Sequence, residues 1–343
     1  MIHELQEIFM KRVFLYIIVL FLSVAPVFAR TVELTLYPAK VTKPAKEYRL
    51  VPKTDELIDA DAAPLYRKAV KSIPDEFEAE QIREWLKLPV KQLPQEQVEV
   101  TLQKYREILK LLSRAARCKE CNWPKFKPWT QSENLNEYFE LARVLKLRAR
   151  LEISRGRDDS ALLAMQTAFG MVRHLAEAPT VIQAQIAAAV GCVMCKEVEQ
   201  FVKEIDSPNL YWALANLPRP LVDMSKAIES ETASLKDYNL LLRRQVEKQL
   251  RPAYDRMRMI EKRLDTYLNA LQCVEAIRNY AAVHNGRPPE KLSDISELEI
   301  PRDMMSGNEF KYHCTCAGVV LQSIMPEGGN KQDSIQYKIV LKK

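Results

Sequence analysis

Apolar side chains recur at helical spacing along most of the chain. Between residues 96 and 116, Val98, Leu102 and Leu109 stand four and seven positions apart, which places them on one face of an α-helix. Prolines separate the shorter apolar segments, so neighbouring helices are expected to pack as hairpins. The pattern therefore predicts a mainly α fold, a multi-helix bundle of αα-hairpins, with helices over residues 77–86, 96–116, 135–149, 160–176 and 221–249.

Two further segments of the helical pattern stand out. Residues 186–195 are apolar on every side, which is typical of a helix enclosed by others. Residues 218–285 predict a long C-terminal helix pair that is kinked at Pro252 and closes at Asn285 and Gly286. With 8 glycines in 343 residues, the chain is poor in the residue that tight turns most need, which favours long helices.

Strand-like alternation is found on either side of the helical pattern. Residues 30–60 predict an extended lead-in with one short edge strand at residues 32–37. Near the C-terminus, strand-like segments joined by glycine-containing turns predict a small antiparallel β meander. The predicted strands and units are residues 310–313, 319–324 and 335–341, a helical bundle domain over 61–217, the helix pair over 218–285 and the meander over 286–343.

The first 29 residues have the order of a secretory signal. Lys11 and Arg12 precede an apolar run over residues 13–24, and a small-residue site ends at Ala29. Cleavage near Ala29 would leave a periplasmic or extracellular chain with no stable transmembrane segment. The alternative is an uncleaved anchor, although the apolar run is shorter than the roughly 20 residues of a membrane span. Translation could start at Met1 or at Met10.

Charge argues against a nucleic-acid partner. The formal net charge is +6, and Lys and Arg alternate with Asp and Glu along every helical segment. Such interleaving indicates solvated helical faces rather than a basic stripe. We therefore expect protein partners in the cell envelope and no nucleic acid. The net positive charge leaves a mild affinity for an anionic cell-wall polymer or lipid surface as an alternative.

Seven cysteines would be mostly oxidised in an exported protein. Two Cys-x-x-Cys pairs have the spacing of a four-thiolate zinc site, but one of them lies in the all-apolar segment, which favours packing or bridging. A thioredoxin-like redox pair is the third alternative, and it requires a strand before the motif. The candidates for disulfides or buried thiols are Cys118, Cys121, Cys192, Cys195, Cys273, Cys314 and Cys316.

Other candidate chemistry is sparse. Trp123, Trp129 and Tyr138 could line a sugar- or peptide-binding shelf, or they could pin a proline-rich loop onto the bundle. His174, His284 and His313 fall in separate elements and are expected to be surface or helix-end groups. Carboxylate pairs such as Asp158-Asp159, or Glu229 with Glu231, are expected on solvated faces or caps. The sequence contains no His-Glu-x-x-His, Gly-x-Ser-x-Gly or phosphate-loop motif, so no catalytic residue, metal or cofactor is predicted.

The segment after the long helix resembles type II secretion pseudopilins. It has a helix end, a Gly-x-x-Pro turn, a Pro-x-Asp step and a Gly-to-Tyr strand entry, carried by residues 276–280, 285–289, 301–303 and 306–312. The resemblance implies a shared helix-plus-meander module. The chain lacks the Gly-Phe-Thr-Leu-x-Glu processing site of that family, so the resemblance does not extend to a filament subunit.

Two broader resemblances add to this picture. Residues 135–175, with Gly156 at the turn, resemble a tetratricopeptide-like hairpin, although no 34-residue repeat follows. The chain as a whole resembles exported helical proteins of planctomycete-type bacteria, which implies export. These features favour a non-enzymatic interaction or scaffold component of the envelope. The alternatives are an accessory of a secretion or pilus-like assembly, and an envelope hydrolase whose carboxylates converge only in the fold.

Overall fold

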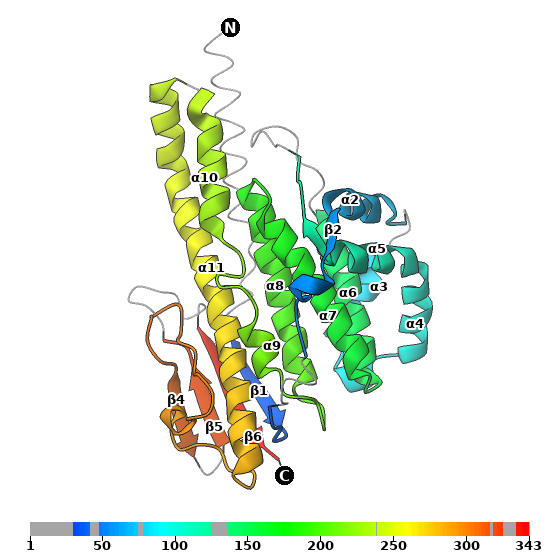
Figure 1. Ribbon diagram of the computed structural model, residues 1–343, viewed down its shortest axis with the longest axis vertical. Helices are drawn as coiled ribbons and strands as arrows, with labels where there is room; N and C mark the ends of the chain where they lie inside the picture. The colour runs from blue at the N-terminus through cyan, green and yellow to red at the C-terminus, as the bar shows by residue number, and fades with distance from the viewer. Residues whose placement is uncertain are drawn as a thin grey trace.

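The mainly α fold with a small C-terminal sheet is confirmed. Figure 1 shows three parts: a group of helices from the first half of the chain, a long helical hairpin that rises beside it, and a sheet against the lower end of that hairpin. The computed structural model describes residues 30–41, 48–74, 78–124, 136–237, 239–315, 318–324 and 334–342.

The first group of helices is short and broken by prolines. Its elements are η2 (Thr54–Glu56), α2 (Ala63–Lys71), α3 (Ala79–Lys87), η3 (Val90–Gln92), α4 (Gln95–Lys104) and α5 (Arg106–Ala116). The single helix expected over residues 96–116 is therefore two helices that break at Tyr105. The Tyr105 side chain is buried and its hydroxyl accepts a hydrogen bond from the Glu78 backbone amide at 3.3 Å, which holds the turn in place.

Three longer helices form the centre of the molecule: α6 (Asn136–Ser154), α7 (Asp158–Ala176) and α8 (Val181–Phe201). α6 and α7 make the predicted hairpin, and Gly156 adopts the left-handed φ of +63° that its turn requires. α8 lies against α6, α7, α10 and α11, as expected for an enclosed helix. It is long and apolar enough to cross a membrane, but 72% of that apolar window is buried inside the protein.

A two-stranded parallel sheet was not predicted. β2 (Ile58–Asp61) pairs with β3 (Cys118–Glu120), two segments some sixty residues apart in sequence. Asp61 Oδ1 accepts hydrogen bonds from the backbone amides of Ala63 at 3.0 Å and Asn122 at 2.8 Å. This carboxylate therefore ties the start of α2 to the cysteine-containing segment after α5.

The long helical hairpin turns inside the segment 221–249, which was predicted to be one helix. α9 (Tyr211–Ala215) leads to α10 (Met224–Ser234), η4 (Leu235–Asp237) and then α11 (Leu240–Val283), which continues through Pro252. The helix therefore does not end at Pro252. Pro252 and Lys248 both lie on the exposed face, where the Lys248 carbonyl that loses its helical partner can bond to water.

The sheet contains the predicted meander and one strand from the other end of the chain. β4 (Lys311–Thr315), β5 (Gly318–Gln322) and β6 (Ile335–Leu341) are antiparallel, and β1 (Arg30–Leu36) pairs in parallel with β6. The strand order is β1-β6-β5-β4, so β1 is an edge strand as expected. Residues 30–36 thus belong to the same unit as the C-terminal meander.

Buried hydrogen bonds join this sheet to α11 and α8. Glu199 of α8 accepts hydrogen bonds from the hydroxyls of Tyr267 at 2.7 Å and Tyr337 at 2.8 Å. Asp303, in the loop after η5 (Leu292–Asp294), accepts from the Thr266 hydroxyl at 2.9 Å and the Ile324 amide at 2.7 Å. These bonds fix the loop and the sheet against one face of the helix.

α11 ends where the sequence predicts. Asn285 and Gly286 have left-handed φ values of 55° and 80°, and the Gly286 amide donates to the Ala281 carbonyl at 2.8 Å. This backbone pattern is a helix C-cap, and it turns the chain toward the sheet.

Candidate functional site

The predicted aromatic shelf lies largely inside the protein. Trp123 stacks on Tyr66 with ring centroids 6.1 Å apart and meets Tyr138 edge-on at 5.7 Å. The Trp123 indole Nε1 donates a hydrogen bond to the His174 carbonyl at 2.7 Å, and Tyr138 is 1% exposed. Trp129 lies outside the described residues. Among the residues described, Trp123 and Tyr138 therefore hold the segment after α5 against α2, α6 and α7. This agrees with the interpretation in which aromatic side chains pin a loop onto the bundle.

His174 lies beneath this aromatic cluster and is fully buried, so the expectation of a surface histidine is wrong. Its Nδ1 is 2.9 Å from the Tyr66 hydroxyl, and its Nε2 is 2.9 Å from the Arg173 guanidinium. Burial, together with the positive charge of Arg173, lowers the pKa of His174 to about 4. The imidazole is therefore neutral at pH 7, and its Nε2 lies near both the Arg173 guanidinium and the Cys118 carbonyl, the latter at 3.1 Å.

The other histidines do not converge on this cluster. His284 stacks on Tyr280 at the end of α11 with ring centroids 3.7 Å apart. His313 is exposed on β4. The three histidines thus occupy three separate places.

The described cysteines form no disulfide with one another, so the bridged alternative is not seen for them. Cys118, Cys121, Cys192, Cys195 and Cys273 are buried thiols, Cys314 is exposed, and Cys316 lies outside the described residues. Burial raises the pKa of Cys118, Cys121 and Cys273, which keeps these groups as poorly reactive thiols. Among the described residues, no group of His, Cys, Asp or Glu has the arrangement of a metal site.

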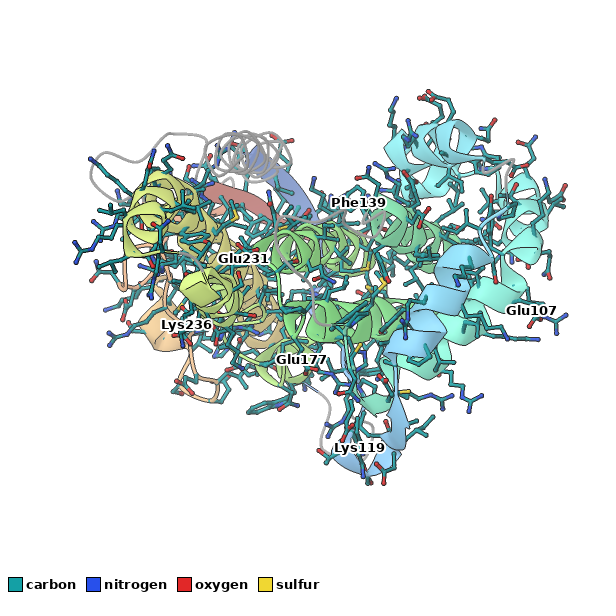
Figure 2. The ribbon with its side chains drawn as sticks, turned by 90° about the horizontal axis from the view of Figure 1, so that it is seen from above. Glu107, Lys119, Phe139, Glu177, Glu231 and Lys236 are labelled. Atoms are coloured by element: carbon teal, nitrogen blue, oxygen red, sulfur yellow. The ribbon has the colours of Figure 1, made fainter. Side chains whose placement is uncertain are left out.

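Buried carboxylates have internal partners. Glu231 is fully buried rather than solvated, and it accepts hydrogen bonds from the Val181 amide at 2.6 Å and the Tyr254 hydroxyl at 3.2 Å. It thereby caps the N-terminus of α8, and Figure 2 shows it between α8, α10 and α11. Glu229, by contrast, is exposed as expected. Glu275 is also buried and has an internal partner, because Arg278 donates two hydrogen bonds to it at 2.9 and 3.0 Å.

A groove of about 720 Å³ is a candidate site, and α4, α5, α6 and α7 form its walls. Its apolar lining includes Leu102, Leu109 and Leu145. Leu163 of α7 lines the groove with 53% of its surface exposed. Glu99 is the single carboxylate among the described lining residues, so the groove does not contain the facing pair that a glycosidase requires.

The charge of the groove is mainly positive. Arg106, Lys110 and Arg117 stand at i, i+4 and i+11 along α5 and its last turn, and all three line the groove. Lys110 pairs with Glu107 at 2.7 Å, and Figure 2 shows Glu107 at the outer edge of α5. Arg106 and Arg117 make no ion pair with any residue that the structure describes. Two guanidinium groups are therefore available to a ligand.

Sequence reasoning missed this groove. The sequence did contain one signal of it, a polar face on α5 that is marked by the spacing of Arg106, Lys110, Ser113 and Arg117. A polar face alone also fits ordinary solvation. The opposite wall comes from α6 and α7, and only tertiary packing places it beside α5.

Comparison of the chain with protein-family models, curated proteins and solved structures found no match. The fold and the groove define a mainly helical protein with a small C-terminal sheet and an open groove that is apolar at its base and basic along α5. The functional argument therefore depends on these features of the chain itself.

Proposed function

We propose that this chain is an exported, non-enzymatic helical protein of the cell envelope, and that it binds an acidic segment of a partner protein in the groove between α4 and α7. The groove, with Arg106 and Arg117 unpaired among the described residues, is the observation that carries the proposal. Export is supported by the signal-like order of residues 1–29, and the non-enzymatic role by the lack of catalytic motifs in the sequence.

The groove favours a peptide over an anionic polymer. A polyanion would use Arg106 and Arg117 but leave the leucines uncovered. A peptide with carboxylates on one side and apolar side chains on the other would cover both, including the exposed part of Leu163. A bidentate guanidinium contact with each carboxylate would set the orientation of the segment.

Photo-cross-linking from inside the groove tests this proposal. A benzoylphenylalanine at position 163 would react with whatever occupies the groove in intact cells, and mass spectrometry would identify the cross-linked peptide. We expect peptides of one envelope protein that combine Asp or Glu with apolar residues. The yield should fall at least tenfold in R106E/R117E, because both guanidinium groups become carboxylates.

The matched control is K71E, which reverses an exposed cation of α2 that does not line the groove. It should leave the cross-link yield unchanged. Equal yields in R106E/R117E and K71E, or cross-links only to carbohydrate, would contradict the proposed partner. Circular dichroism of both variants checks that the helices are intact.

Export is tested separately by fractionation and by the mature N-terminus. We expect the protein isolated from its host to leave the cytosol and to begin at Arg30. A chain that retains residues 1–29 in the membrane fraction would indicate the anchor alternative. An intact chain in the cytosol would contradict export in either form.

An accessory role in a secretion or pilus-like assembly is the second candidate. It is favoured by the arrangement of β4, β5 and β6 against α11, which is the helix-plus-meander module that the resemblance implies. Such an accessory should form oligomers whose cross-links map to residues 286–342. A monomer by sedimentation velocity at micromolar concentration would contradict this role, without affecting the groove.

A further inference from the structure

The hairpin of α10 and α11 carries an apolar end that the proposed groove does not use. This end, residues 235–237 and 239–244, is called the hairpin tip here, and Figure 1 shows the hairpin rising above the other described elements. Leu240 and Leu241 are 60% and 80% exposed, whereas Leu235 is buried between the two helices. The tip therefore offers two adjacent leucines to its surroundings.

Basic side chains surround and follow these leucines. Between residues 235 and 258 the sequence has seven Lys or Arg and three Asp or Glu. Arg244, Lys248 and Arg251 are exposed and make no ion pair with the residues that the structure describes. Lys236 is also exposed, and Figure 2, which looks down on this end of the molecule, shows it on the outside of the hairpin.

We propose that the hairpin tip docks on the surface of an anionic phospholipid bilayer. Leu240 and Leu241 enter the boundary between headgroups and acyl chains, and the positive charge of Arg244, Lys248 and Arg251 attracts the anionic headgroups. A second copy of the tip is a poorer occupant because it would bring the same excess of positive charge to the contact. A neutral apolar protein surface would leave the cations without partners.

Vesicle co-sedimentation tests this docking with the protein as isolated from its host. The lipid is phosphatidylcholine with one quarter phosphatidylglycerol, and the compared proteins are the wild type and L240S/L241S. Because both chains have the same N-terminus, any difference between them reports on the tip. We expect the partition coefficient to fall at least tenfold in L240S/L241S.

The matched control is V100S, which removes an apolar side chain of similar exposure from α4 at a position that does not line the groove, and it should partition like the wild type. R244Q/K248Q should bind severalfold more weakly, and the wild type should bind poorly to pure phosphatidylcholine. Equal partitioning of L240S/L241S and the wild type would overturn the proposal. So would equal binding to charged and neutral vesicles.

Hydrogen exchange provides a second readout that locates the contact. Amides of residues 236–244 should exchange more slowly on anionic vesicles, while amides of α5 in the groove should not change. Two results would assign the tip another occupant. One is protection confined to α5. The other is a wild-type dimer, observed without lipid, that becomes a monomer in L240S/L241S. Failure of this test leaves the groove proposal unaffected, because that proposal depends on R106E/R117E.

Discussion

The two halves of α11 belong to one continuous helix but have opposite surroundings. From Leu264 to Ala281 almost every side chain is buried, including polar ones such as Asn269 and Glu275. From Leu240 to Arg263, one face packs on α10 and the other faces outward with mostly charged side chains. The lower half is part of the body of the molecule, and the upper half forms the projecting hairpin.

This difference shows where the protein uses its polar groups. A buried polar group destabilises the fold unless it has a partner, so each one in the lower half of α11 specifies a particular neighbour. In the upper half, Arg244, Lys248 and Arg251 are exposed to solvent instead. Substitutions in the body should therefore change stability, and substitutions in the hairpin tip should change binding alone.

The largest expected effect is at Arg278, the central buried cation of the body. Its guanidinium donates to Glu275, to the Tyr37 carbonyl and to the Ser207 carbonyl, the last at 2.9 Å. R278M leaves Glu275 buried without its counter-ion, so the free energy of unfolding should fall by about 3–5 kcal/mol. Urea denaturation followed by circular dichroism measures this change.

The double variant E275L/R278M is the matched control for that prediction. Removing the carboxylate as well eliminates the uncompensated charge, so part of the lost stability should return. A double variant as unstable as R278M would show that the carbonyl contacts, rather than the ion pair, hold this region.

A pH effect of about 3 kcal/mol is expected from His174. Its pKa is about 4 in the folded protein and about 6.5 when unfolded, so the unfolded state binds the proton more readily. The contribution of this group is therefore fully present above pH 6.5 and is lost as the pH falls toward 4. By pH 5 the loss should reach about 2 kcal/mol.

H174Q isolates this contribution, because the variant lacks the titrating group while retaining an acceptor for Arg173. The difference in unfolding free energy between wild type and H174Q should shrink as pH falls from 7.5 to 5. A difference that is constant across this range would mean that His174 is not held neutral by the fold.

Close packing within the body predicts a smaller effect at Gly170. A Cβ at this position of α7 would lie 2.6 Å from the Ala116 Cβ and 3.0 Å from its backbone oxygen. G170A should therefore lower the free energy of unfolding by about 2 kcal/mol, despite the higher helix propensity of alanine. G191A is the control, because its Cβ would meet side-chain methyl groups rather than backbone, those of Leu264 at 3.1 and 3.2 Å and one of Leu221 at 3.5 Å. If G170A were as stable as the wild type, α5 and α7 would have to lie further apart than they do in the structure.

The sequence allowed the helical segments and the meander to be predicted because both depend on local periodicity. It did not show which distant groups meet. β1 pairs with a strand some three hundred residues away, and Glu231 caps α8 from a helix that follows it. Pro252 was predicted to kink the long helix because a proline removes a backbone hydrogen bond. α11 continues through Pro252, which lies on the solvent face, where the Lys248 carbonyl can bond to water.

The candidate site shows the same limit. The aromatic residues 123 and 138 were singled out by type, and the structure brings them together in a packed cluster rather than on an open surface. The spacing of Cys192 and Cys195 suits a metal, a bridge or a helix interior equally well, and only the enclosure of α8 decides. The groove could not be read from one helix, because its walls belong to four.

The smallest stability effect is expected at the hairpin tip, and it is the most direct test of the contrast between the halves of α11. L241S exchanges a side chain that is 80% exposed, so the free energy of unfolding should change by less than about 0.5 kcal/mol. L264S, at a fully buried position of the lower half, should cost several kcal/mol by the same urea measurement. If L241S were as destabilising as L264S, the tip would be part of the folded core, and its leucines would not be available to a membrane.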